Sequence, residues 1–220
     1  MEPVDALLAA AYELSSPDDN RALYARWADT YESGFIVDSR YVYHDQVAKV
    51  FATHGLFAID ASEAIVDIGC GTGLAGAAIR RLRPLAIDGI DISPEMLRQA
   101  AAKRHDDVLV YRALIEADLT QPLTIADDTY AGAVSVGTFT HGHVGPAALD
   151  EVVRIVRAGG HVAIGINAAH YTATNFSDAL RRLADGGAIA NVELTTAPIY
   201  DGADSDDLDN VAQIATFEIV

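Results

Sequence analysis

From residue 64 onward, short apolar stretches alternate with longer segments that carry helical periodicity. The apolar stretches are rich in β-branched residues and are typical of strands covered on both faces; they are 64–68, 85–90, 108–111, 131–136 and 161–166. Helical patterns lie between and after them, at 74–83, 94–103, 147–156 and 172–184. This alternation predicts a parallel sheet built from βαβ units.

The two ends of the chain add to this pattern. Strands predicted at 191–199 and 212–220 flank an acidic segment, which indicates a C-terminal antiparallel hairpin, and helices are predicted ahead of the sheet at 3–14, 17–30 and 41–53. The sequence therefore predicts a single α/β domain over residues 1–220. Residues 61–220 form its core, a doubly wound, mostly parallel seven-stranded sheet that ends in the hairpin, and residues 1–60 form a helical cap or lid.

Composition narrows the class of partner. A chain of 220 residues, half of them apolar, can bury one substantial core, and its formal net charge of -17 disfavours a nucleic-acid partner. Cys70 is the one cysteine, which excludes an intrachain disulfide and a site of several thiolates, and no metal is expected. The first residues lack a basic signal segment and no apolar run is long enough to span a bilayer. We therefore expect a cytoplasmic protein without a membrane partner.

The stretch from Ile65 to Gly73 carries the first chemical signal. A predicted strand runs into a loop with glycine at alternate positions, Gly69, Gly71 and Gly73, and the loop opens into a helix. Glycines let a ligand approach the backbone, and free N–H groups at a helix start favour an anionic group such as a carboxylate. The segment 71–76 also fits the dinucleotide pattern G-x-G-x-x-G, so an NAD(P)-dependent oxidoreductase is an alternative.

Acidic residues follow three successive predicted strands: Asp67, Asp91 and Asp118. Asp91 can accept hydrogen bonds from both hydroxyls of a ribose, although a solvated helix-capping acid would look the same. Asp118 can accept from an adenine amino group, although an ordinary loop acid would also fit. Asp67 would repel a pyrophosphate but attract an ammonium group, which S-adenosylmethionine (SAM) carries and NAD lacks. Because parallel strands end at one edge of the sheet, the three acids together favour a SAM site.

These residues resemble the motifs of the class I SAM-dependent methyltransferases, from about Ile65 to the C-terminus. The resemblance implies that the glycine loop holds the methionine part of SAM, Asp91 the ribose and Asp118 the adenine, with two apolar side chains on the adenine ring. The implied cofactor residues are Asp67, Gly69, Cys70, Gly71, Thr72, Gly73, Asp91, Ile92, Met96, Asp118 and Leu119. One departure is Ala158, where the family usually has proline. The stretches 24–32 and 138–144 are similar to the branch named after the Williams-Beuren syndrome chromosome region.

The acceptor side is expected after the fourth strand. Gly137 and Thr138 should line the crevice beside the reactive methyl group. His141 or His143 would orient or deprotonate the acceptor, unless both are loop histidines bonded to backbone.

An aromatic stripe precedes the sheet. Tyr24, Trp27, Ala28 and Tyr31 share one helical face, which is more often plain core, but we expect Tyr31 and Trp27 to close over SAM as part of a lid. The sequence thus predicts SAM-dependent methyl transfer to an O, N or S atom of a small molecule by in-line displacement, with S-adenosylhomocysteine as product. The oxidoreductase and a non-methylating SAM-binding protein on the same fold remain alternatives.

Overall fold

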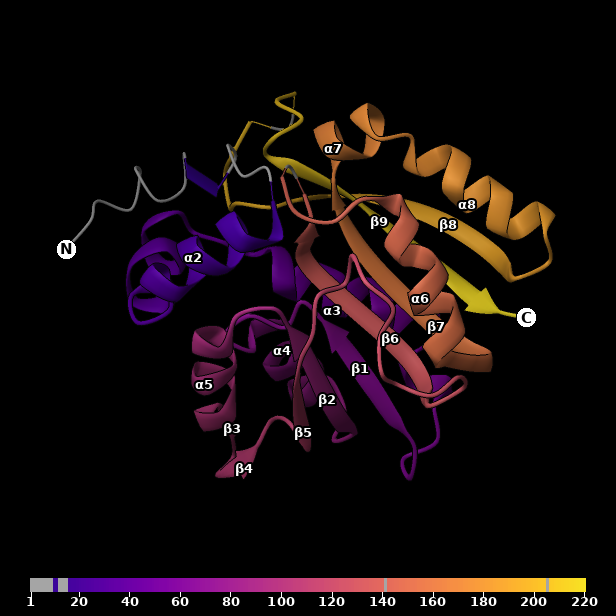
Figure 1. The fold of residues 1–220 in the computed structure, drawn as a ribbon, viewed down its shortest axis with the longest axis horizontal. Coiled ribbons are helices and arrows are strands. Elements are labelled where there is room, and N and C mark those ends of the chain that lie inside the picture. The colour runs from indigo at the N-terminus through magenta and orange to yellow at the C-terminus, as the bar shows by residue number, and fades with distance from the viewer. Residues whose placement is uncertain (1–9, 12–15, 141, 205) are drawn as a thin grey trace.

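A mostly parallel sheet organises the chain in the computed structural model, which describes residues 10–11, 16–140, 142–204 and 206–220. Within these residues, the main sheet has seven strands in the order β5-β2-β1-β6-β7-β9-β8 (Figure 1). The first five strands of that order pair in parallel, whereas β9 pairs antiparallel with both β7 and β8. The doubly wound sheet with a C-terminal antiparallel hairpin is therefore confirmed.

The central strands are short and buried, as their apolar sequences predict. All five residues of β1 are buried, and only the ends of β2 reach solvent. The strands of the main sheet are β1 (Ala64–Ile68), β2 (Ala86–Asp91), β5 (Ala113–Glu116), β6 (Tyr130–Phe139), β7 (Val156–Asn167), β8 (Ile189–Pro198) and β9 (Val211–Ile219).

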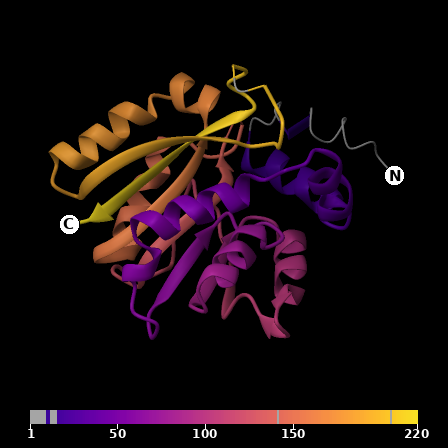
Figure 2. The ribbon, with the colours of Figure 1, turned by 180° about the vertical axis from the view of Figure 1, so that it is seen from behind.

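Helices cover both faces of the sheet, which explains why its strands lack an alternating polar face. One apolar cluster joins the sheet to α6 (Leu149–Ile155) and α8 (Phe176–Asp185). The other joins the opposite face to α3 (Tyr43–His54), α4 (Leu74–Leu82) and α5 (Pro94–Ala102), the helices nearest the viewer in Figure 2. Among the described residues, no helix combines the length and the apolar character needed to cross a bilayer.

The segment ahead of the sheet divides into two parts. Helix α3 belongs to the sheet layer, because Val47 and Phe51 are fully buried against it. Helix α2 (Pro17–Trp27) and a following π-helix (Tyr31–Ile36) lie instead at the edge where β1, β2 and β6 end (Figure 1). The helix predicted at 3–14 lies mostly outside the described residues.

The third strand of the sheet is not where the sequence placed it. Residues 108–109 form β4, which pairs with β3 (Arg104–His105) in a separate two-stranded ribbon, and the sheet strand is β5. Asp106 and Asp107 both have positive φ, so they make the tight turn of the ribbon. Val108 is 54% exposed on this surface ribbon, whereas Val110 and Tyr111 after it are buried, and β5 is a half-exposed edge strand with a weak apolar signal.

Other boundaries differ for local reasons. The helix predicted at 172–184 is two helices, α7 (Ala168–Ala173) and α8, because Asn175 takes the left-handed conformation between them. Strand β6 continues past residue 136 through a register shift at Gly137, whose φ is +75°. Helix α6 is preceded by a short 3₁₀ turn, Pro146–Ala148.

Candidate active site

The glycine loop joins β1 to α4 with three left-handed residues. Gly69, Gly71 and Gly73 have φ of +66°, +53° and +95°, which L side chains rarely adopt. A Cβ on Gly69 would lie 1.9 Å from Oγ1 of Thr138, so only glycine fits there. The Thr138 hydroxyl donates to the carbonyl of Ile68 at 3.1 Å and thereby ties the loop to β6.

Asp91 holds the loop at the end of β2. One carboxylate oxygen accepts from Gly71 N–H at 2.8 Å, and the other accepts from Ser93 N–H at 2.9 Å. Burial raises the pKa of Asp91, and these backbone donors oppose that rise. Each oxygen has a further lone pair, so the carboxylate can still accept from hydroxyls of a ligand.

Asp67 lies beneath the loop and does not line the cavity above it. Side chains two apart on a strand share a face, so Asp67 points with Ile65 toward α4. Its Oδ2 accepts from the Tyr111 hydroxyl at 2.6 Å and from Gly76 N–H at 3.0 Å. Burial raises the pKa of Asp67 to about 7, these two donors oppose the rise, and the negative charge of Asp91 adds to it. Asp67 does not line the cavity in this structure, and its expected contact with a ligand ammonium stays a prediction.

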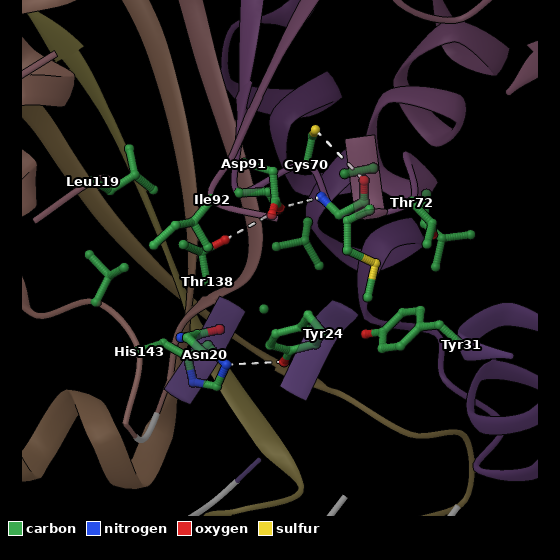
Figure 3. Close-up of a pocket in the computed structure, with 18 of the residues that line it drawn as sticks. Asn20, Tyr24, Tyr31, Cys70, Thr72, Asp91, Ile92, Leu119, Thr138 and His143 are labelled. Carbon is green, nitrogen blue, oxygen red and sulfur yellow. Dashed lines mark hydrogen bonds between the residues drawn. The ribbon is translucent and has the colours of Figure 1, made fainter. Parts of the chain in front are cut away.

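A cavity of about 930 Å³ opens over the loop, between the sheet edge and α2 (Figure 3). The structure brings most of the predicted site residues together in its wall: Tyr31, Gly69, Cys70, Gly71, Thr72, Asp91, Ile92, Met96, Asp118, Leu119, Gly137, Thr138 and His143. Asp118 follows β5, where its Oδ1 accepts from Thr120 N–H at 2.8 Å. Burial raises the pKa of Cys70 well above its usual value, so its sulfur stays a thiol.

Three predicted residues do not line this cavity, and a fourth is not described. Asp67 and Gly73 lie behind the loop, and Trp27 lines a neighbouring cavity instead. His141 lies outside the described residues.

The cavity also takes residues that the sequence did not single out. Asn20 and Tyr24 of α2 point into it (Figure 3), and Tyr41 and His44 line it from the start of α3. The ring of His44 stacks on Tyr41, and burial lowers the pKa of His44 more strongly than neighbouring Asp45 raises it. No sequence signal separates these side chains from ordinary core residues, because they reach the site only through the packing of the cap.

Two buried polar atoms test whether the cavity fits SAM. Thr72 Oγ1 and His44 Nδ1 are buried and have no hydrogen-bond partner among the described residues, and both residues line the cavity. An unsatisfied buried polar atom costs about 1–3 kcal/mol, so these atoms call for a ligand with polar groups. The amino-acid end of SAM offers both donors and acceptors, and the glycine loop beside Thr72 leaves room for it.

A second cavity of about 560 Å³ lies next to the first, under α2 and the π-helix. It shares part of its wall with the first cavity, namely Tyr24, Tyr31, Tyr41, Gly137 and His143. Its other lining residues come from the cap, the ends of β6 and β7 and the segment after β8: Ala11, Trp27, Phe35, Tyr43, Phe139, Thr140, Asn167, Ile199 and Tyr200. Two adjoining cavities can hold a donor and an acceptor side by side.

One polar pair stands where the two cavities meet. The Tyr24 hydroxyl and His143 Nε2 are 3.0 Å apart, and both residues line both cavities (Figure 3). An imidazole can accept or donate a proton, so His143 can exchange one with an acceptor bound at this junction.

Comparison with known proteins agrees with this geometry. The family model of a methyltransferase domain matches residues 65–160, the part of the chain that carries the glycine loop, Asp91 and Asp118. The human methyltransferase-like protein 27 is 30% identical over 162 residues, which are 73% of this chain and 63% of that protein. The O-methyltransferase resE of Aspergillus sclerotiorum is 28% identical over 104 residues, covering 47% of this chain and 39% of the fungal protein. The chain thus spans less than two thirds of each of these relatives.

Solved structures share the fold. The TehB-like SAM-dependent methyltransferase from Corynebacterium glutamicum superposes with a TM-score of 0.56 at 18% identity, over 93% of this chain and all of the other. Fold and cavity together define a methyltransferase domain of the Rossmann-like kind. In its motifs and fold the chain is similar to the class I SAM-dependent methyltransferases, and this similarity supports SAM as the cofactor.

Proposed function

We propose that this protein transfers a methyl group from SAM to an O, N or S atom of a small molecule and releases S-adenosylhomocysteine. The observation that carries the proposal is the pair of adjoining cavities, one over the glycine loop and Asp91, the other lined by aromatic side chains of the cap. SAM supplies a methyl carbon bound to a positively charged sulfur. The protein's task is to align an acceptor with that carbon, and alignment alone can contribute roughly 7–11 kcal/mol.

Each part of the first cavity suits one part of SAM. Asp91 accepts from the ribose hydroxyls, because it lines the cavity beside Ile92 and Met96 and its carboxylate has spare lone pairs. Asp118 and Leu119 flank the adenine. The remaining proposed cofactor residues are Gly69, Cys70, Gly71, Thr72 and Thr138 around the methionine part, with Tyr31 above it and Gly137 beside the methyl group.

The residues behind the cavity act through the loop. Gly73 provides the left-handed residue from which α4 begins, and Asp67 fixes that helix through Gly76 N–H. Trp27 supports Tyr31, because their ring centroids are 5.1 Å apart in an edge-on arrangement. These are positioning roles.

Proton removal falls to the pair at the junction. A hydroxyl acceptor loses its proton as its oxygen bonds to the methyl carbon, and the carbon–sulfur electron pair stays on sulfur. Tyr24 can take the acceptor's proton while it passes its own to His143 Nε2, 3.0 Å away, which becomes an imidazolium. His141, outside the described residues, stays a second candidate for this role.

Further features support a small acceptor. The relative resE is an O-methyltransferase by name, which supports an oxygen acceptor. The net charge of -17 opposes a nucleic-acid substrate, and the cytoplasmic location stays a prediction from the single cysteine.

The test is the affinity for S-adenosylhomocysteine, measured by isothermal titration calorimetry. Asp91→Asn should weaken binding roughly 10- to 100-fold, because charge-assisted hydrogen bonds contribute about 1.5–3 kcal/mol. Asp185→Asn, an exposed acid at the end of α8, is the matched control and should leave affinity unchanged. Circular dichroism would show whether the fold persists.

Three results would contradict the proposal in different ways. Binding of NADH with no response to SAM would favour the oxidoreductase. SAM that stays intact through turnover would favour a non-methylating protein on this fold. Equal affinity of Asp91→Asn and the unmodified protein would refute the ribose assignment.

A further inference from the structure

The second cavity has an uncharged wall. None of its described lining residues is Asp, Glu, Lys or Arg. Burial raises the pKa of Tyr41 and of Tyr43, so both hydroxyls stay neutral. A carboxylate or phosphate brought into this cavity would lose its hydration and find no opposite charge, at a cost of several kcal/mol. An anionic acceptor is therefore disfavoured, and the net charge of -17 repels it further.

Aromatic rings in mutual contact form most of this wall. The centroid of Phe35 lies 5.2 Å from that of Trp27, 5.3 Å from Tyr31 and 5.6 Å from Tyr41. Aromatic pairs at such separations favour stacked and edge-on contacts. The space between these rings, open solvent included, is about 560 Å³, and its largely aromatic wall suits a planar ring system.

Two buried polar groups in this wall need a partner. Trp27 Nε1 and Tyr43 Oη have no hydrogen-bond partner among the described residues, and both residues are almost fully buried. The indole N–H is a donor only, so it requires an acceptor atom. An ammonium group has only donors and cannot meet that need, whereas an oxygen can. The unpartnered indole thus favours a ligand with an acceptor atom, such as a hydroxyl oxygen, over a protonated amine.

We infer that the second cavity binds a planar, uncharged aromatic alcohol and presents its hydroxyl oxygen to SAM. The inference deepens the proposed function and rests on it. The hydroxyl reaches the methyl group at the wall shared by the two cavities, where Gly137 has no side chain. Tyr24 and His143 lie at the same wall and can accept the hydroxyl proton. In this reaction the acceptor oxygen would gain the methyl carbon, the carbon–sulfur electron pair would stay on the sulfur of the product thioether, and the hydroxyl proton would pass to Tyr24 as Tyr24 gives its own to His143.

Three probes share a naphthalene ring and differ in their polar group: 2-naphthol, 2-naphthoic acid and 2-naphthylmethylamine. They test whether the cavity prefers an uncharged ligand and whether it prefers a hydroxyl oxygen. Calorimetry on protein saturated with S-adenosylhomocysteine measures their binding without turnover. We expect 2-naphthol to bind at least about tenfold more tightly than the acid or the amine. With SAM in place of the product, only 2-naphthol should release S-adenosylhomocysteine.

A charge placed in the cavity provides the variant. Thr140 lines the second cavity and is half-buried, so Thr140→Asp should weaken 2-naphthol and favour the amine, reversing the preference by at least about tenfold. Thr124→Asp adds the same charge at an exposed position outside both cavities and should change nothing.

The outcomes separate this inference from the proposed function. Failure of S-adenosylhomocysteine itself to bind would refute the proposed function. Product binding combined with tighter binding of the acid or the amine, or with no binding of any probe, would overturn the inference and leave methyl transfer standing.

Discussion

Replacing Asp67 by Asn removes a buried carboxyl while keeping its shape. The side-chain oxygen of Asn can still accept from Tyr111 and Gly76, and its amide group replaces Oδ1, which is buried without a partner among the described residues. The substitution therefore tests the energetic effect of the charge beneath the glycine loop. We expect Asp67→Asn to stabilise the fold above pH 7.

The magnitude follows from the pKa. An unfolded aspartate has a pKa of about 3.9, whereas burial raises that of Asp67 to about 7 in the fold. Between these values the folded protein holds a proton that the unfolded chain has lost, so stability falls as the pH rises and levels off above pH 7. At about 1.4 kcal/mol for each unit of pKa, the full loss is about 4 kcal/mol, of which roughly 2–3 kcal/mol falls between pH 5 and pH 8.

Urea unfolding at pH 5, 6, 7 and 8 measures the effect. The free energies of the two proteins are subtracted at each pH, so that other titrating groups cancel. The difference should favour Asp67→Asn increasingly up to pH 7 and then stay constant. Parallel pH profiles would refute the reasoning, because they would show that Asp67 titrates alike in the folded and unfolded states. In the same variant, SAM affinity should depend less on pH, since the ionised carboxylate attracts the cation.

Two other substitutions test the cap and the junction of the cavities. Lys103→Met removes the ion pair between the end of α5 and the π-helix. The rate of S-adenosylhomocysteine dissociation, measured by stopped-flow fluorescence, should therefore rise several-fold. Arg98→Met breaks an exposed ion pair within α5 and should leave that rate unchanged. Gly137→Ala strains a residue with φ of +75° and places a methyl group 3.2 Å from the Tyr41 hydroxyl. Turnover should fall at least about tenfold, with little change in the affinity for S-adenosylhomocysteine. Gly145→Ala is the control, because nothing lies within 4 Å of the added methyl group.

The sheet and the glycine loop could be predicted because their signals are local. The run from Ile65 to Gly73 contains a buried strand, three left-handed glycines and a helix start, and each of these depends on adjacent residues. The third strand could not be placed in this way. Burial follows from tertiary position, and the apolar Val108 lies on an exposed ribbon while the sheet strand Ala113–Glu116 is partly exposed.

The acidic residues at the strand ends show what a sequence motif cannot predict. Their place at strand ends was predictable, but the face on which each carboxylate points was not. Asp91 lines the cavity, while Asp67 faces Tyr111 on the covered side of the sheet. The ammonium contact with Asp67 that favoured SAM over NAD therefore stays a prediction, whereas the predicted resemblance to the methyltransferases agrees with the comparisons.

The cap has two different surfaces that the sequence alone did not distinguish. Its polar edge is bonded to the cofactor side of the core: Gln99 of α5 donates to Asp29 at 2.9 Å, and Arg21 donates to the carbonyl of Ile92 at 3.3 Å. Its apolar face carries the rings of the second cavity. These hydrogen bonds join the cap, which lines the acceptor cavity, to residues beside the proposed ribose site, so we expect cofactor binding to affect the acceptor cavity. Because Tyr31 lines both cavities, cofactor binding should favour the arrangement of rings that receives the acceptor, which gives an ordered sequence with SAM first.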